Sequence, residues 1–273
     1  MALRHLAELR LLADEFTEAG GWPDVPCPAC ASGTLAPKDK ESVAAEESRL
    51  SHERYSECDD AEPDWISGYF HGSLRCTLPS CAENVAVTGE FRIREGAGYN
   101  EYNGILYGFS YQAKCFVPAL PLIREGDSFP QTVKDLLVAA SAILYLDPSS
   151  AANRVRAAIE ELLDLHRVPR TFISKKHKRV RYTAHKRIEL FKERKPKFAD
   201  AADLLMAVKW IGNDGSHGNE LGVGDVLDGV ELLNHALELT YDTSAADLRK
   251  RAAAINKHGG IPRKRAATKA GRP

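Results

Sequence analysis

The chain has 273 residues, of which 44% are apolar and 27% are charged, as in an ordinary globular protein. This length suits two modest domains, or one domain with a substantial extension. No stretch approaches the roughly 18 consecutive apolar residues that a membrane span needs, which argues against a membrane protein. Residues 1–16 mix Leu with Arg, Glu and Asp and lack the apolar core of a secretory signal, so we expect a cytoplasmic protein.

The net charge of −1 conceals a strong separation of charge along the chain. Residues 1–128 carry 11 basic and 21 acidic side chains, for a net charge of −10. Residues 165–197 carry 13 basic and 2 acidic side chains, and residues 249–273 carry 9 basic and no acidic ones. Basic blocks of this kind suit a nucleic-acid partner, whereas the acidic half would repel it. The alternative is that the two halves attract each other, within one chain or between subunits.

The acidic half predicts a small α+β domain over residues 1–128. Residues 1–18 place leucines at helical spacing, which favours an amphipathic helix. Residues 31–64 are polar and acidic, as in a surface insertion or a partly disordered segment. After this segment, apolar and polar residues alternate with a period of two, and aromatic and β-branched side chains are frequent. This pattern indicates antiparallel strands. We expect these strands at residues 65–70, 84–93 and 102–117.

From Pro130 onward the apolar period becomes helical, and an all-α domain is predicted over residues 129–258. The stretch Asp147-Pro148-Ser149-Ser150 ends the first predicted helix and provides the N-cap of the second. The remaining residues, 259–273, form a basic, low-complexity tail that we expect to be disordered. The predicted helices lie at about residues 130–146, 150–166, 183–194, 199–211, 223–242 and 245–257.

Four of the six cysteines form two close pairs. Two residues separate Cys27 from Cys30, and four separate Cys76 from Cys81. Each pair can present two sulfurs to one metal ion from a tight turn, and four thiolates form the closed tetrahedral site that is typical of structural zinc. The sequence therefore predicts a zinc-ribbon-like domain with one structural zinc ion. A closed site stabilises the fold and has no open position for catalysis.

The other cysteines and two histidines leave alternatives open. Cys58 lies in the acidic segment and Cys115 in a predicted strand, so neither is assigned to the metal. His52 and His71 are the substitutes if one of the four cysteines is not a ligand. The four thiols could also be buried without binding a metal. In a chain without an export signal, close cysteine pairs favour metal binding over disulfides.

A run of basic residues separates two of the predicted helices. Phe172, Tyr182 and Phe191 are interleaved with it, a composition typical of loops that contact nucleic acid. The alternative is a solvated charge run without a ligand. The cations assigned to a nucleic-acid surface are Lys175, Lys176, Lys178, Arg179, Arg181, Lys186 and Arg187.

A polar turn, Asn213-Asp214-Gly215-Ser216-His217, follows the helix that contains Trp210. A turn this short can present several polar side chains together, or it can use them to cap neighbouring helices. With the helix Asn153–Asp164 and the helix end Leu239-Thr240-Tyr241, this turn makes residues 148–243 resemble the domain of unknown function 4145 family. That family is similar to the HEPN (higher eukaryote and prokaryote nucleotide-binding) helical domains. Many of those are metal-independent RNases of toxin–antitoxin, restriction and anti-phage systems.

The resemblance implies a site as well as a fold. In HEPN nucleases the motif is an Arg, a polar residue that is often Asn, three further residues and then a His. The Arg and His of two subunits meet at a dimer interface and cleave RNA by activating its ribose hydroxyl. It therefore implies a homodimer through the helical domain, with Asn213 and His217 at the site. The Arg position is Gly212 here, which argues against catalysis because the developing phosphorane charge needs a cation. Lys209, one helical turn earlier, is the candidate cation, with Arg154 or Arg156 of the neighbouring helix as alternatives.

Three functional hypotheses follow. The first is a zinc protein that binds RNA or DNA in a prokaryotic defence, restriction or toxin–antitoxin setting. The second is a metal-independent RNase toxin that uses His217. The third is a protein–protein adaptor that assembles with an effector or antitoxin protein and has no nucleic-acid activity. Binding to nucleic acid that falls steeply with salt separates the first two from the third.

Overall fold

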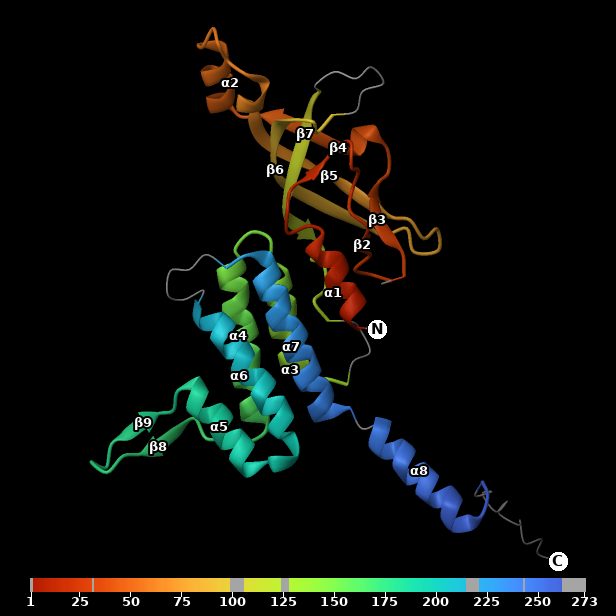
Figure 1. Ribbon diagram of the computed structural model, residues 1–273, viewed down its shortest axis with the longest axis vertical. Helices are drawn as coiled ribbons and strands as arrows, with labels where there is room; N and C mark the ends of the chain where they lie inside the picture. Colours follow the sequence, from red (N-terminus) through yellow and green to blue (C-terminus); the bar gives the residue numbers. More distant parts are fainter. Residues whose placement is uncertain are drawn as a thin grey trace, which may run out of the picture.

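The structure is a computed structural model that describes residues 2–30, 32–98, 106–123, 128–214, 221–242 and 244–261. An antiparallel sheet occupies one end of the molecule and a group of helices the other (Figure 1). The predicted α+β class is confirmed, with the strands of the large sheet in the N-terminal half and a helical C-terminal half. Among the described residues, no helix is both long and apolar enough to cross a membrane.

The sheet has seven strands in the order β1-β7-β6-β5-β3-β2, and β4 also pairs with β5. Its three long strands, β5, β6 and β7, follow one another in the chain and pair antiparallel. Burial alternates along β6, where Val85, Val87, Gly89 and Phe91 are buried and the residues between them are exposed. The strands are β1 (Phe16–Thr17), β2 (Val25–Pro26), β3 (Thr34–Pro37), β4 (Val43–Glu47), β5 (Ser67–Cys76), β6 (Asn84–Glu95) and β7 (Tyr107–Val117).

The acidic segment, residues 31–64, contributes two strands to the sheet in its described part. β3 and β4 pair with successive parts of β5, with Leu35 opposite Cys76 and Val43 opposite Gly72. The chain then forms α2 (Arg49–Ser56) and the short 3-10 helix η2 (Pro63–Trp65) before it enters β5. The backbone of both strands is satisfied because one edge of β5 pairs with them.

The N-terminal helix is shorter than the sequence predicts. The helix α1 (Ala2–Arg10) ends well before residue 18, and the chain continues into β1. Phe16 accounts for the difference, because its buried ring packs 4.9 Å from the ring of Trp22 and 5.8 Å from that of Tyr111. Pairing of β1 with β7 satisfies the backbone there, so tertiary contacts override the helical pattern.

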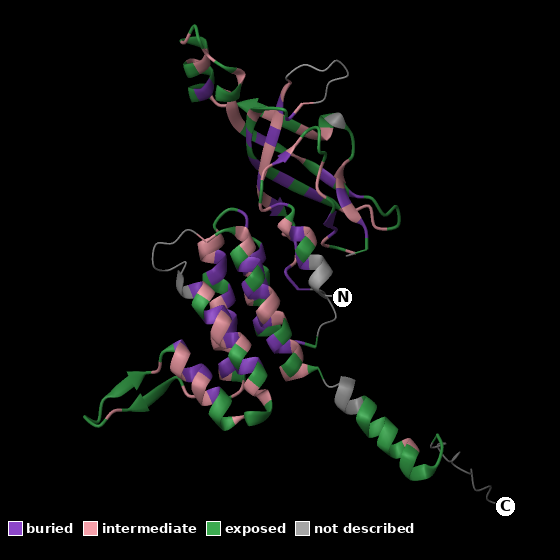
Figure 2. Ribbon diagram, in the orientation of Figure 1, coloured by how far each residue is buried: buried purple, intermediate pink, exposed green. Residues whose placement is uncertain are grey.

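The six predicted helices are present, with ends that differ by a few residues. Asp147 caps the second of them and accepts a hydrogen bond from the Ser150 N–H over 2.8 Å. Buried residues line the facing sides of the helices, whereas the described part of the last helix is mostly exposed (Figure 2). The helices are α3 (Gln131–Ser141), α4 (Pro148–Leu165), α5 (Ala184–Arg194), α6 (Ala199–Asp214), α7 (Val223–Tyr241) and α8 (Ser244–His258).

One continuous core joins the two halves of the chain. The helix α1 belongs by sequence to the β domain, yet it packs against α7. The Arg10 guanidinium forms an ion pair with Asp228 of α7 and donates to the Gly224 carbonyl over 3.1 Å. The Tyr145 hydroxyl donates to the Leu9 carbonyl over 3.0 Å. The N-terminal helix therefore attaches the sheet to the helices.

Candidate functional site

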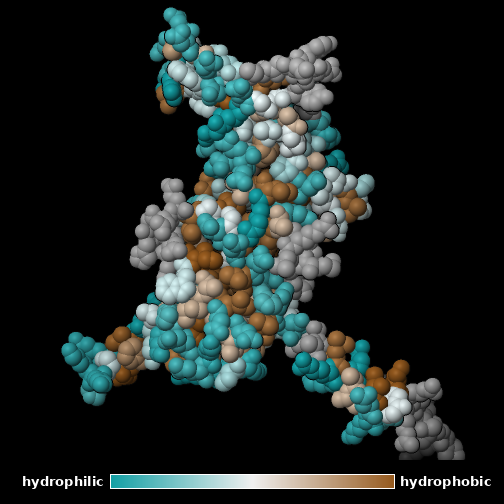
Figure 3. Space-filling view, viewed as in Figure 1, coloured by the Kyte–Doolittle hydropathy of each residue, from teal (hydrophilic) through white to brown (hydrophobic). Residues whose placement is uncertain are grey.

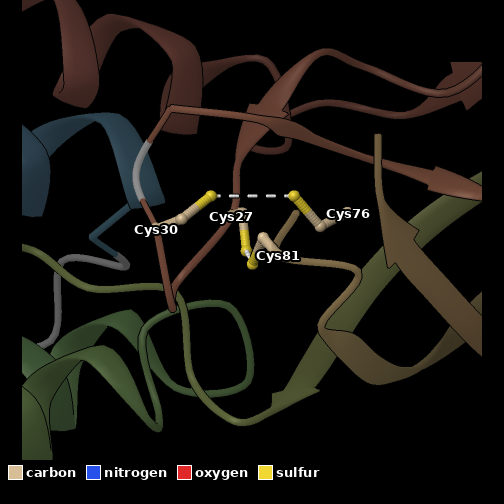
Figure 4. Close-up of side chains that lie close together, drawn as sticks. All are labelled: Cys27, Cys30, Cys76 and Cys81. Carbon is tan, nitrogen blue, oxygen red and sulfur yellow. Dashed lines mark hydrogen bonds between the residues drawn. The ribbon is translucent and has the colours of Figure 1, made fainter. Parts of the chain in front are cut away.

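The four predicted metal ligands lie together, in the turns of two adjacent hairpins (Figure 4). Cys27 and Cys30 lie between β2 and β3, in a turn closed by the Cys27 N–H donating to the Gly33 carbonyl over 2.8 Å. Cys76 and Cys81 lie at the turn from β5 to β6, which is closed in the same way onto the Glu83 carbonyl over 2.8 Å. Pairing of β3 with β5 brings the two turns side by side.

The distances between the sulfurs fit one tetrahedral metal ion. The Sγ atoms of Cys27 and Cys81 lie 3.8 Å apart, and those of Cys30 and Cys76 lie 3.7 Å apart. All four sulfurs lie within 4.8 Å of one another. Four sulfurs at about 2.3 Å from one zinc ion would lie about 3.8 Å apart. The separation is far longer than the roughly 2.05 Å of a disulfide bond, so the cluster could hold a metal ion.

The surroundings of the thiols favour ionisation of one of them and oppose ionisation of another. Hydrogen bonds from the backbone N–H groups of Ser32 and Gly33 lower the pKa of Cys30 to about 6. Burial raises the pKa of Cys76 to about 12. Four neighbouring thiolates repel one another unless a cation lies between them, so a bound metal ion would provide the charge that the full set requires.

Gly33 lies so close to the cysteine cluster that there is no room for a side chain at this position. A Cβ atom at this position would lie 2.5 Å from the Cys76 sulfur and 2.9 Å from the Leu78 Cβ. The Gly33 N–H also donates to the Cys30 sulfur over 3.4 Å. Gly33 is not among the site residues predicted from sequence, although a glycine three residues after a cysteine pair is a usable signal for such a turn.

The alternative ligands lie elsewhere. Cys58 and Cys115 are not part of the described cluster of four. His52 lies 3.3 Å from a carboxylate oxygen of Glu47, and His71 lies 3.7 Å from one of Glu46. Both histidines therefore pair with β4 at the surface, and neither is needed as a substitute ligand.

The basic segment, predicted as a loop, folds into a β-hairpin. Its strands are β8 (Thr171–Ile173) and β9 (Arg179–Arg181), and it projects from the helical body (Figure 1). At its base the rings of Phe172 and Tyr182 stack with centroids 4.7 Å apart. The tip of the hairpin is hydrophilic, and apolar side chains lie behind it (Figure 3).

The seven cations predicted for the nucleic-acid surface fall into three groups. The four at and beside the tip are exposed and form no ion pair with an acidic residue in the described part of the chain. Arg181 is exposed but lies 3.1 Å from Glu160 of α4, and Lys186 lies 3.0 Å from Glu189 of its own helix. Arg187 is buried. The exposed group is Lys175, Lys176, Lys178 and Arg179.

Arg187 is a structural residue. Its side chain is only 2% exposed, and its guanidinium donates to the Asp164 carboxylate over 2.6 Å and to the Val168 carbonyl over 3.2 Å. Hydrogen bonding to Arg170, together with the charge of Arg187, lowers the pKa of Asp164. The nucleic-acid contact predicted for Arg187 does not fit this burial, because the guanidinium is inside the protein and already paired with Asp164.

Most of the predicted catalytic turn lies outside the described residues, including His217 and the side chain of Asn213. Lys209 is described, and it is only 5% exposed. Its ammonium lies 2.9 Å from the centre of the Trp210 ring. Burial and the charge of Arg156 lower the pKa of Lys209.

Arg156 lies against Gly212, the residue that the HEPN resemblance aligned with an Arg. A Cβ atom at Gly212 would lie 3.4 Å from the Arg156 Cβ and 3.6 Å from its Cδ. Arg154, two residues earlier on α4, is exposed. Of the two arginines considered from sequence, Arg156 is therefore the one that reaches Gly212, and Lys209 lies near it.

These features define a protein with a four-cysteine β domain and a helical domain that carries a basic hairpin. Residues 138–258 match the family model of the domain of unknown function DUF4145, which confirms the resemblance seen in the sequence. Residues 14–119 match the family model of a second domain of unknown function, DUF8608. No curated protein and no solved structure matches the chain. Neither family description states a function.

Proposed function

We propose that this protein binds nucleic acid through its basic hairpin and holds a structural zinc ion in its four-cysteine site. The observation that carries the proposal is the hairpin itself. It presents Lys175, Lys176, Lys178 and Arg179 on a projection, without acidic partners among the described residues. Cations that already pair with carboxylates gain little from a phosphate, whereas solvated ones gain by releasing counterions.

The aromatic side chains beside these cations favour contact with bases as well as phosphates. Phe172 and Tyr182 form a stacked pair next to the basic strands, and Phe172 is 38% exposed. Exposed rings beside cations are typical of surfaces that bind single-stranded nucleic acid, whether RNA or DNA. The acidic sheet domain would repel phosphate, so the nucleic acid would lie on the helical side of the molecule.

Zinc is the metal that best suits the cysteine site. Four thiolates at these separations offer soft ligands in tetrahedral geometry, which zinc prefers. The ion would cross-link the β2–β3 turn to the β5–β6 turn and stabilise that end of the sheet. The HEPN resemblance adds a homodimer and a prokaryotic defence, restriction or toxin–antitoxin setting to this proposal.

Binding to labelled RNA and DNA, measured by fluorescence anisotropy over a range of salt concentrations, tests the proposal. Replacing five hairpin cations with Gln should weaken binding to all sequences. It should also flatten the salt dependence, by about 0.7–0.9 in slope for each phosphate that the variant no longer neutralises. The five are Lys175, Lys176, Lys178, Arg179 and Arg181.

The control variant replaces Arg49, Arg54 and Arg75, which lie in the sheet half, with Gln. It removes surface charge without touching the hairpin and should bind as the parent does. If the hairpin variant also binds like the parent, the charge run is only solvated surface. If the parent retains no nucleic acid at low salt, the protein is an adaptor for an effector or antitoxin protein.

A second candidate function, metal-independent RNA cleavage, is favoured by one observation. Arg156 lies against Gly212 and Lys209 lies one helical turn before it, so positive charge adjoins the turn that contains His217. A cation beside a general base is the pair that ribose-hydroxyl attack on a phosphate needs.

A further inference from the structure

The sheet domain contains an aromatic pocket that is separate from the cysteine cluster and the hairpin. Its volume is about 460 Å³, within the size range of small-molecule sites. Phe16, Trp22 and Tyr111 form the aromatic wall, and Pro37 and Val43 from the β3–β4 edge lie among the other lining residues. A predominantly apolar pocket of this size can enclose most of a small ligand or a long side chain.

The aromatic wall is a packed cluster of rings. Trp22 lies parallel to Tyr111 with ring centroids 6.3 Å apart and an interplanar angle of 25°. Phe16 packs 4.9 Å from Trp22, and the buried ring of Phe70 packs edge-on against Tyr111 at 5.2 Å. The buried ring of Phe70 contacts both Trp22 and Tyr111, so packing holds these two lining rings in place.

Two carboxylates line the same pocket, and no lysine or arginine does so among the described residues. Glu18 is held by its N–H, which donates to the Phe109 carbonyl over 2.9 Å. Glu18 and Tyr111 both line the pocket, and burial, together with the charge of Glu18, raises the pKa of Tyr111 to about 12. Asp39 accepts the Ser42 hydroxyl over 2.6 Å, which lowers its pKa and keeps it ionised.

The loop that carries Glu18 and Trp22 has a defined conformation. Gly20 donates to the Thr17 hydroxyl over 3.1 Å, and Gly21 donates to the Glu18 carbonyl over 3.2 Å. Gly21 has a φ of 74°, in the left-handed region that a side chain disfavours. The loop is therefore shaped to hold Trp22 over the sheet.

We propose that this pocket binds an organic cation, an alkylated ammonium or guanidinium group whose apolar body lies against Trp22 and Tyr111 and whose charge faces Glu18 and Asp39. Ring faces carry negative electrostatic potential and attract such cations, and the two carboxylates add to this attraction. The net charge of −10 over residues 1–128 raises the local concentration of cations and repels phosphate. The same chemistry is offered by a free quaternary ammonium compound and by a basic side chain on a peptide.

Isothermal titration calorimetry with choline and with its neutral isostere 3,3-dimethylbutanol tests the role of charge. The two probes have nearly the same shape, so a pocket built for a cation should bind choline about tenfold more tightly or better. A short peptide with one trimethyllysine forms the second arm. Tighter binding of the peptide identifies a peptide partner, and tighter binding of choline identifies a free small molecule.

Variants connect any binding to this pocket. Glu18→Gln should weaken choline binding several-fold, whereas Asp24→Asn, which removes an exposed acid outside the pocket, should not change it. Trp22→Ala should abolish binding, and circular dichroism shows whether that variant still folds. The proposal is overturned if neither cation binds, if the neutral isostere binds as tightly as choline, or if Glu18→Gln binds like the parent.

Discussion

Arg187 and Asp164 form an ion pair of 2.6 Å at the base of the basic hairpin, with the arginine buried and the aspartate half-buried. Asp164 also pairs with Arg170, which precedes β8, whereas Arg187 follows β9. One carboxylate of α4 therefore holds both ends of the hairpin. This ties the position of the proposed nucleic-acid surface to the helical core.

Replacing Arg187 should destabilise the protein much more than replacing Arg170. Arg187→Ala removes a buried cation and leaves the Val168 carbonyl without its donor, and we expect a loss of about 3 kcal/mol in the free energy of unfolding. Arg170→Ala removes an exposed partner of the same carboxylate and should cost about 1 kcal/mol or less. Urea unfolding measures both. Equal losses would mean that the buried pair adds nothing beyond a surface one.

The Asp164 pairing should also appear in the pH dependence of stability. The pKa of this carboxyl is lower in the folded protein than its ordinary value, chiefly through the hydrogen bond from Arg170. Its contribution is therefore complete above the ordinary pKa near 4 and is lost as the pH falls through the lower, folded value. The parent should be more stable than Asp164→Asn at pH 6, and the difference should shrink below about pH 4. A difference in free energy of unfolding between the parent and Asp164→Asn that stays constant from pH 6 to below pH 4 would contradict this.

Retention of the metal should depend on which pair of cysteines is replaced. Purified parent should contain one zinc ion per chain by elemental analysis, and a chelator should lower its melting temperature because the ion joins two turns of the sheet. Cys76→Ser combined with Cys81→Ser should contain no zinc. The matched control, Cys58→Ser with Cys115→Ser, should retain it. Zinc retained in the first double variant, or absent from the parent, would show that the cluster is not a zinc site.

Gly33 offers a sharper test, because it is not itself a ligand. Gly33→Ala would place a methyl group 2.5 Å from the Cys76 sulfur and push that ligand away. We expect roughly tenfold weaker zinc affinity, measured by competition with a chromophoric chelator. Gly260→Ala is the control, since nothing lies within 4 Å of its added methyl group. Unchanged affinity in Gly33→Ala would mean that the turn adjusts freely around the metal.

The sequence predicts the helices well because burial on one face imposes the helical period. α4 and α7 follow it closely, with Val155, Leu162, Val230 and Leu237 buried. The cysteine cluster was also predictable, because spacing within each pair determines how two sulfurs can meet. The pairs come together only through the β3–β5 pairing, and β3 lies in a segment with little strand pattern.

The features that sequence missed depend on contacts between distant segments. The period of residues 1–18 is helical throughout, yet β1 forms because Phe16 finds Tyr111 across the sheet. The run of basic residues gives no sign that Arg187 is buried, because its partner Asp164 lies 23 residues earlier on another helix. In the sequence, Gly212 stands where the HEPN motif has an arginine. Only the fold shows that Arg156 lies against this glycine.

That proximity gives the second candidate function its own prediction. If RNA cleavage occurs, His217 would take the proton of the ribose hydroxyl and Arg156 would stabilise the charge that develops on the phosphate. Cleavage of labelled RNA should then proceed with a chelator present, and a DNA strand of the same sequence should stay intact because it lacks the hydroxyl. His217→Ala should reduce the rate by about 10²–10⁴-fold, and Arg156→Ala by about 10²–10³-fold.

Arg154→Ala is the matched control for Arg156→Ala, since Arg154 lies two residues earlier on the same helix and is exposed. It removes the same charge from the same helix but not from the neighbourhood of Gly212, so the rate should stay close to that of the parent. Equal losses in both arginine variants would indicate a general effect of charge on RNA binding. If the parent binds RNA but does not cleave it, the helical domain is an RNA-binding domain without catalytic activity, as the glycine at position 212 would suggest. Melting temperatures complete the test, because a His217→Ala variant that loses stability rather than activity would identify His217 as a cap for a neighbouring helix.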